Sequence, residues 1–230
     1  MTPIKQQSGV REWNAQHALL RRLLEKDKDY RQALPVFLAH HAAVHTAKLA
    51  WEKQGSYQDE VLAGLTETQM RSVPPGRPHS AAWALWHITR IEDVTLNLLL
   101  ANSPQVFSRG NWSDKLEVAT ASVGNAMSAA EIAELSAALN LKALLAYRLA
   151  VGKRTREIVR RLNPALLWDR PAPERLERIV QEGAVGEDER WLLKYWGGHP
   201  ASNLLLMPAT RHAFVHLNEI ARMRPRLLRV

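Results

Sequence analysis

The chain has 230 residues, of which 46% are hydrophobic and 23% are charged, as in an ordinary globular protein. It has no cysteine, which excludes disulfides, zinc–thiolate sites and a cysteine nucleophile. Any metal must therefore be bound by histidine, carboxylate, carbonyl or water. The formal net charge of +8 would suit an anionic partner, but the basic residues are spread along the chain, as on the solvated faces of helical bundles.

The first residues, MTPIKQQSGVREWNAQ, lack the apolar core of a signal peptide. No apolar run approaches the roughly 20 residues that a membrane-spanning helix needs. We therefore expect a cytoplasmic protein with no membrane association.

Helix signals dominate the sequence, and strand signals are almost absent. A first helix is expected over 9–27. Four long helices are predicted over 31–53, 80–101, 140–162 and 208–223. The second of these should carry Pro35 near its first turn and stop at Gly55. A short turn should precede Pro208.

Capping residues support two of the long helices and one short helix. Ser80 and Asn140 precede long helices as N-caps, and the Ser128/Glu131 spacing predicts a capping box for a helix over 129–138. Two more short helices are expected in RPAPERLERIVQEG and EDERWLLKYW, and SPQVFSRGNWSDKLEVATASVGN should be irregular. The fold class is therefore all-α, a four-helix bundle with additional short helices in the crossover connections, in a single domain over 1–230.

Three histidines should point into the bundle. On a helical wheel, His87 lies in the middle of the apolar stripe of its helix. His212 and His216 are four residues apart and border the apolar arc of the last helix. An i,i+4 pair and a third imidazole from a facing helix would form a three-histidine metal site with open coordination positions, as catalytic sites have. The alternative is that these are hydrogen-bonded core residues.

Two segments carry a resemblance to a known family. WALWHITRIEDVTLNLL, followed far downstream by TRHAFVHLNEI, resembles the DinB/YfiT-like family of metalloenzymes. The family pattern W-H-[IL]-x-x-x-E falls on Trp86, His87 and Glu92, and its H-x-x-x-H falls on His212 and His216. The resemblance implies an up-down-down-up four-helix bundle, frequently dimeric, that holds a divalent metal. Zinc or nickel is expected first, and iron or manganese would also suit these ligands.

The chain departs from the family pattern in two respects. The connection between the motifs, with the Trp112 loop and the helices near 173–196, is longer than a minimal bundle requires and would reshape the pocket. The family assigns no role to His41, His45 or His79. We favour His45 as a group behind the ligands or as packing, rather than as a fourth ligand.

Four other side chains have candidate roles near the histidines. Glu92 lies about 140° from His87 on the wheel, so we expect it to pair with a buried arginine, Arg148 or Arg154. Glu219, one turn beyond His216, is expected either to accept an imidazole N–H or to face solvent. Trp83 and Trp86 would form a pocket wall or pack in the core.

The resemblance implies a reaction class. Family members with assigned activities include transferases that use low-molecular-weight thiols, so a thiol-dependent S-transferase or related detoxification enzyme acting on a small molecule is expected first. The catalytic group would be a metal-bound water or thiol, and no catalytic side chain is assigned. A metal-dependent hydrolase would use the same ligands. The alternative outside enzymes is a basic helical homodimer that binds nucleic acid or a protein partner.

Overall fold

The structure, a computed structural model, describes residues 3–26, 28–49 and 55–229. These residues form helices and connecting loops, and none of them is in a β-strand. The predicted all-α class is confirmed.

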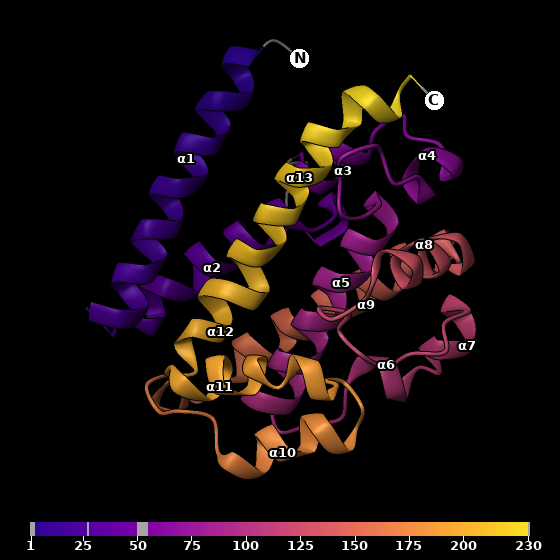
Figure 1. Ribbon diagram of the computed structural model, residues 1–230. Helices are drawn as coiled ribbons and strands as arrows, with labels where there is room; N and C mark the ends of the chain where they lie inside the picture. Colours follow the sequence, from indigo (N-terminus) through magenta and orange to yellow (C-terminus); the bar gives the residue numbers. More distant parts are fainter. Residues whose placement is uncertain (1–2, 27, 50–54, 230) are drawn as a thin grey trace.

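Four long helices form the bundle (Figure 1): α2 (Tyr30–Val44), α5 (Ala81–Val94), α9 (Leu141–Arg161) and α13 (His212–Leu227). α5 packs against α9 and α13, and α2 also contacts both, so the four helices form a closed ring. Every residue of α5 is buried. The predicted four-helix bundle is therefore confirmed, with α5 as its most enclosed helix.

A further long helix, α1 (Pro3–Arg21, 19 residues), precedes the bundle and packs against α2. Shorter helices fill the connections, as expected. The short α-helices are α3 (Tyr57–Leu62), α4 (Glu67–Arg71), α6 (Val106–Arg109), α7 (Trp112–Leu116), α8 (Ala129–Ala138), α10 (Pro173–Gln181), α11 (Trp191–Gly198) and α12 (Ser202–Leu206). The π-helical segments are η1 (Arg22–Lys26), η3 (Thr95–Leu100) and η6 (Met207–Arg211). The 3₁₀ turns are η2 (Ala47–Leu49), η4 (Pro164–Leu167) and η5 (Glu187–Glu189). The segment expected to be irregular contains α6 and α7.

The predicted caps are present. Ser80 accepts a hydrogen bond from the backbone N–H of Trp83, and Asn140 accepts one from that of Ala143. Ser128 forms the capping box of α8. These side chains satisfy N–H groups that have no partner within the helix, which is why the helix starts could be read from the sequence.

α2 is shorter than predicted. It ends at Val44, and His45 has extended backbone geometry. Local side chains account for the early end, because Ser56 donates its hydroxyl to the carbonyl of His45, and Asp59 accepts the N–H of Ala47 at 2.8 Å. Residues 47–49 form a 3₁₀ turn, and 50–53 lie outside the described residues. Pro35 is the sixth residue of α2, beyond the first turn where it was expected.

The last helix begins earlier than predicted. The expected turn before Pro208 is helical, since α12 continues through η6 into α13. The wider π turn accommodates Pro208, which has no N–H to donate. Thr210 donates its hydroxyl to the carbonyl oxygens of Leu205 and Leu206, both at 2.9 Å.

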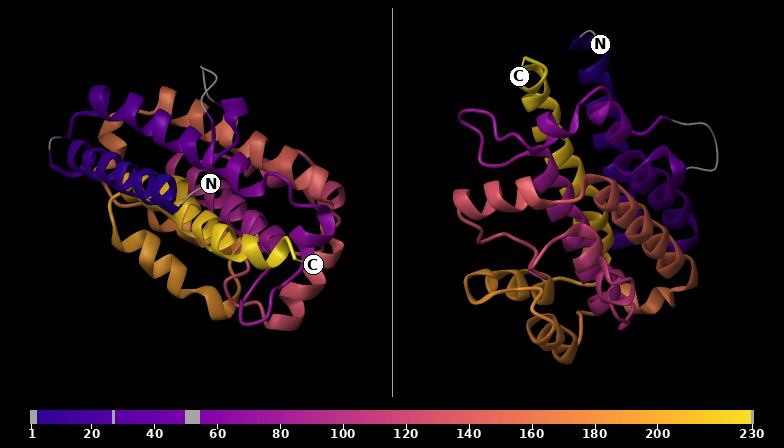
Figure 2. Two further views of the ribbon diagram at one scale, coloured as in Figure 1. Left: turned by 90° about the horizontal axis from the view of Figure 1, so that it is seen from above. Right: turned by 90° about the vertical axis from the view of Figure 1, so that its right-hand side faces the viewer.

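The start of α1 and the end of α13 lie at one end of the molecule, and α10 and α11 lie at the other (Figures 1 and 2). Among the described residues, no single helix is long and apolar enough to cross a membrane. α8 and α9 meet that criterion only when taken together, and they are bent by 96° relative to each other.

Candidate metal centre

The structure brings together the three predicted histidines. His87 comes from α5, whereas His212 and His216 come from the first turns of α13. Each offers one ring nitrogen, and these three atoms lie within 4.8 Å of one another. The ring centroid of His216 is 5.0 Å from that of His87 and 4.7 Å from that of His212. We call His87, His212 and His216 the three-histidine cluster; their assignment as metal ligands stays a prediction.

The spacing of the nitrogens fits a shared ion. Two imidazole nitrogens bound to one ion at about 2.1 Å lie roughly 3.0–3.4 Å apart when the angle between the bonds is right-angled or tetrahedral. Nε2 of His87 and Nε2 of His212 are 3.2 Å apart. His212 and His216 are less deeply buried than His87, so the cluster reaches the surface on the α13 side.

Two contacts fix the orientation of the His87 ring. Its Nδ1–H donates to the carbonyl oxygen of Val123 at 2.6 Å, which leaves the lone pair on Nε2, the nitrogen that faces His212. The Trp83 ring stacks on the imidazole with 4.7 Å between centroids and 9° between planes. Trp83 therefore forms a wall of the site and also packs in the core, where Trp86 is fully buried.

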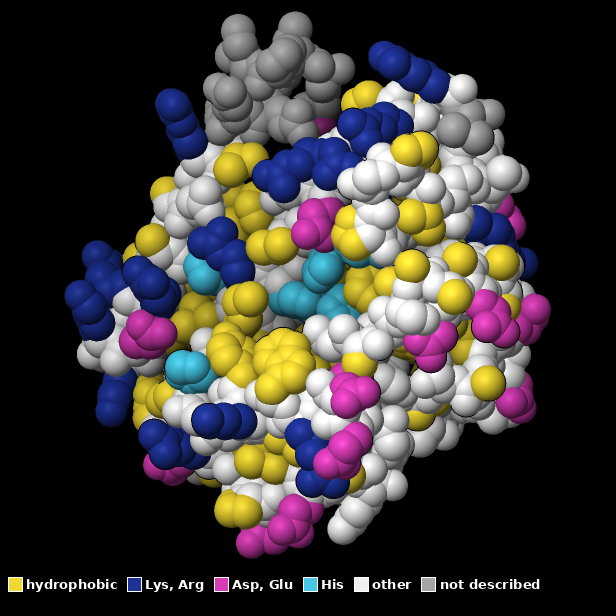
Figure 3. Space-filling model, viewed as in Figure 1, with side chains coloured by type: hydrophobic (Ala, Val, Ile, Leu, Met, Phe, Trp, Pro, Cys, Tyr) yellow, Lys and Arg dark blue, Asp and Glu magenta, His cyan; other side chains and the backbone are white. Residues whose placement is uncertain are grey.

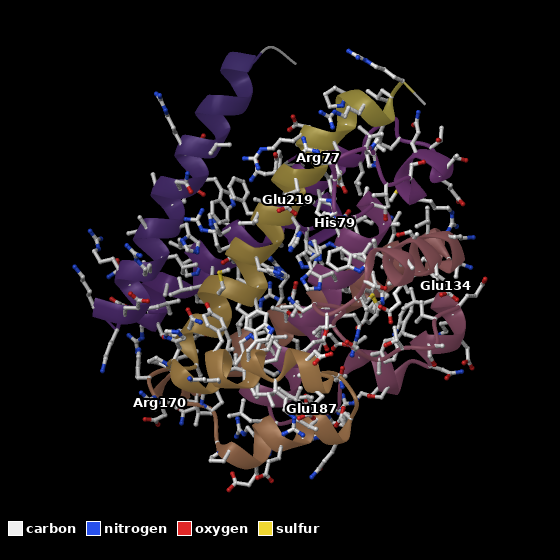
Figure 4. The ribbon with its side chains drawn as sticks, viewed as in Figure 1. Arg77, His79, Glu134, Arg170, Glu187 and Glu219 are labelled. Atoms are coloured by element: carbon white, nitrogen blue, oxygen red, sulfur yellow. The ribbon has the colours of Figure 1, made fainter. Side chains whose placement is uncertain are left out.

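Glu219 lies beside His216. This position agrees with the expectation that its carboxylate accepts an imidazole N–H, and not with the alternative that it faces solvent. One carboxylate oxygen is 2.7 Å from Nδ1 of His216 and 3.1 Å from Nε2 of His79. A proton on Nδ1 of His216, beside this carboxylate, would leave the ring's lone pair on Nε2. His79, to which no role was assigned, holds the same carboxylate from the residue before Ser80, the N-cap of α5 (Figure 4).

The electrostatics favour neutral imidazoles. Burial, followed by the nearby His216, lowers the pKa of His87 to about 3. Burial, and then His87, hold the pKa of His212 well below its usual range. Both rings are therefore unprotonated at neutral pH, as ligation requires. The contacts with His216 and His79 lower the pKa of the Glu219 carboxyl, which is ionised.

Glu92 has partners other than those expected. It accepts hydrogen bonds from Nε2 of His41 at 2.9 Å, Nε2 of His45 at 2.8 Å and the hydroxyl of Thr155 at 2.6 Å. All these groups are fully buried. Burial alone would raise the pKa of Glu92, but the facing His45 and His41 outweigh it and hold that pKa well below the usual range.

The predicted pairing of Glu92 with an arginine is therefore wrong. Arg148 donates to Gln58 and to the carbonyl oxygen of Val44, and Arg154 donates to Asn97 and Glu157. The wheel gave the direction of Glu92 on α5, but it did not reveal that His41 of α2 and His45, the residue that follows α2, lie there.

His41, His45 and Glu92 form a second group whose potential ligand atoms lie within 4.8 Å of one another. This group could hold an ion, but its contacts are also ordinary hydrogen bonds between imidazole N–H groups and a carboxylate. Burial, followed by the charge of Arg148, lowers the pKa of His45 to about 3. His45 faces Glu92 and is not grouped with the three-histidine cluster.

A loop anchor behind His87 was missed by the sequence reasoning. The buried carboxylate of Glu189 accepts hydrogen bonds from the hydroxyl of Ser122 at 2.8 Å and from the N–H of Ala126 at 3.0 Å. These bonds fix the loop whose Val123 carbonyl holds His87. The available signal was Gly124 in SVGN: its φ is +84°, and a Cβ there would lie 2.6 Å from the Trp86 ring.

Together, the bundle and the cluster define a class: an all-α protein with a candidate three-histidine metal centre between two of its long helices. The family model of the DinB superfamily matches residues 50–207, and the chain belongs to this superfamily. The match includes His87 and ends before His212. No curated protein matches the chain.

Proposed function

We propose that this protein is a divalent-metal-dependent enzyme that binds its ion through His87, His212 and His216. The observation that carries the proposal is the convergence of three ring nitrogens from two helices, with Nδ1 of His87 held by a carbonyl oxygen. Three protein ligands leave positions open for water or substrate. Membership of the DinB superfamily also supports this proposal.

The chain supplies groups that orient these ligands. A bound divalent ion provides Lewis-acid chemistry, which lowers the pKa of a water or thiol and polarises a substrate group. Glu219 and the carbonyl of Val123 hold the outer nitrogens of His216 and His87. Arg77 lies on the same side of the molecule as Glu219 and His79 (Figure 4), where its positive charge would attract the carboxylates of a cosubstrate.

The reaction we propose first is transfer of a low-molecular-weight thiol to an electrophilic small molecule. The sulfur forms a bond to carbon, the leaving group departs with the electron pair of the broken bond, and the thiol proton passes to solvent. The thiol must belong to the cosubstrate, because the chain has no cysteine. Zinc or nickel is the proposed ion, since both accept imidazole ligands.

Elemental analysis of the purified protein tests the metal site. We expect about one divalent ion per chain, and its loss in His212→Ala and His216→Ala with unfolding transitions close to wild type, since both side chains are less deeply buried than His87. His199→Ala is the matched control, because His199 is exposed and lies outside the three-histidine cluster. Retention of the ion in both cluster variants would overturn the proposal.

The reaction is tested with 1-chloro-2,4-dinitrobenzene, with and without cysteamine. Metal-dependent chloride release only with the thiol supports the transferase. Metal-dependent hydrolysis of 4-nitrophenyl acetate without thiol would replace it with a hydrolase. Tight, salt-dependent DNA binding by metal-free protein that shows neither activity would favour the non-enzymatic alternative.

A further inference from the structure

We propose that the part of the substrate that does not react is an uncharged aromatic or similarly bulky apolar group, bound in a cavity beside His212. The proposal rests on the proposed function only for the position of the reacting group. It also assigns a role to α11, in the long connection that a minimal bundle does not require.

The cavity has a volume of about 280 Å³ and lies between α5, α11 and η6. Its lining includes Ile91, Trp191, Tyr195, Trp196, Met207 and His212. Three of these residues are aromatic side chains of α11. Among the described residues that line the cavity, none is Asp, Glu, Lys or Arg.

His212 links the cavity to the three-histidine cluster. Its imidazole forms part of the cavity wall, and its Nε2 is 3.2 Å from Nε2 of His87. A ligand in the cavity would therefore lie next to any ion held by these nitrogens. Figure 3 shows histidine side chains at the centre of this face with hydrophobic side chains immediately beside them.

The lining decides the charge of the ligand. An anionic group would need a cationic or N–H-rich wall, and a buried cation is normally paired with an opposite charge. The lining offers neither Lys, Arg, Asp nor Glu, so burial of a charged ligand there would leave the charge without a counter-ion. An uncharged apolar group avoids that desolvation cost and gains contact with the rings.

The size of the cavity suits one substituted ring. A dry apolar cavity of roughly 150 Å³ is enough to hold benzene. The volume of about 280 Å³ therefore accommodates a ring with a substituent that extends toward His212.

Trp191 marks the mouth of the cavity. Its side chain is 57% exposed, although it is one of the largest apolar side chains, whereas Trp196 on the same helix is only 2% exposed. Trp196 belongs to the core and supports the wall, while Trp191 has apolar surface that a ligand would cover. Asn125 is also exposed, and it places one amide at the rim.

The test compares two small hydroxamates that share one metal-binding group. Zinc-loaded protein is titrated calorimetrically with acetohydroxamate and with benzohydroxamate. We expect benzohydroxamate to bind at least tenfold more tightly, and Trp191→Ala to reduce that preference to less than threefold. Leu145→Ala, which removes a 42% exposed apolar side chain from α9, should keep the full preference. Equal affinities in wild type, or an unchanged preference in Trp191→Ala, would overturn the proposal.

A binding experiment on metal-free protein tests the cavity independently of the metal site. 2-Naphthol should bind it saturably and at least fivefold more weakly after Trp191→Ala. If 2-naphthol binds in this way but neither hydroxamate does, the cavity stands and the proposed metal function fails. If both hydroxamates bind equally and 2-naphthol does not bind, the metal site stands and the cavity proposal fails.

Discussion

Glu219→Gln should weaken metal binding without unfolding the protein. The carboxylate lies 2.7 Å from Nδ1 of His216 and 3.1 Å from Nε2 of His79. Glutamine keeps the size of the side chain but removes the negative charge that favours an N–H on Nδ1 of His216. A side chain that is 34% exposed can accommodate the amide without strain. The lone pair on Nε2 of His216 would then be less well oriented toward the cluster.

The size of the effect follows from the exposure of Glu219. Replacing the carboxylate partner of a metal-binding histidine typically costs 10–100-fold in affinity. Solvent screens the charge of a side chain that is about one-third exposed, so the lower end of that range applies. We expect a loss of about tenfold, equivalent to about 1.4 kcal/mol.

The dissociation constant is measured by competition with a chromophoric zinc chelator. Glu157→Gln is the matched control, because Glu157 is a 42% exposed carboxylate on α9 that pairs with Arg154 and Arg161. It should bind zinc as tightly as wild type. An unchanged affinity in Glu219→Gln would refute a positioning role for this carboxylate. Equal losses in both variants would show that overall charge, and not contact with His216, controls the affinity.

Three further predictions concern the elements around the site. Glu189→Ala should lower the unfolding free energy by about 2 kcal/mol, since charged hydrogen bonds contribute 1.5–3 kcal/mol, and should also weaken zinc binding in the same chelator assay. Gly152→Ala should destabilise by about 1–3 kcal/mol in urea, because its Cβ would lie 2.8 Å from Nδ1 of His45; Gly9→Ala, with open space around its Cβ, should instead stabilise slightly. Burial lowers the pKa of His40 to about 3 in the folded protein. The unfolded chain therefore binds a proton at His40 more readily than the folded protein does. The stability that the neutral His40 ring contributes is fully present above pH 6.5 and is lost as the pH falls toward 3. Urea midpoints should therefore fall as the pH decreases, and a flat profile would contradict this.

The convergence of the three-histidine cluster was predictable because it depends on helical periodicity. His87 lies within the apolar stripe of α5, and His212 and His216 repeat at the spacing of one helix face. An apolar stripe must face the core, so residues on two such stripes meet whenever the helices are neighbours. The cap at Ser80 was predictable for a similar reason, since it depends on residues only three positions apart.

The partner of Glu92 was not predictable, because it depends on which helix lies opposite. A wheel gives the direction of a side chain from its own helix, but not the identity of the facing helix. The end of α2 was missed for a related reason: the hydroxyl of Ser56, 11 positions away, binds the carbonyl of His45. Helix propensity contains no information about such a contact.

The position of α5 has a consequence for every test of the site. His87 faces α13, and Glu92, five residues later, faces His41 of α2 and His45 just beyond its end. Both side chains are buried in a helix that has no exposed residue, so a change at either one affects packing as well as chemistry. His212 and His216 are less deeply buried than His87, and truncating them is expected to remove a ligand with a smaller loss of core contacts. Loss of metal is therefore diagnostic in variants of α13, whereas the same loss in a variant of α5 also follows from unfolding.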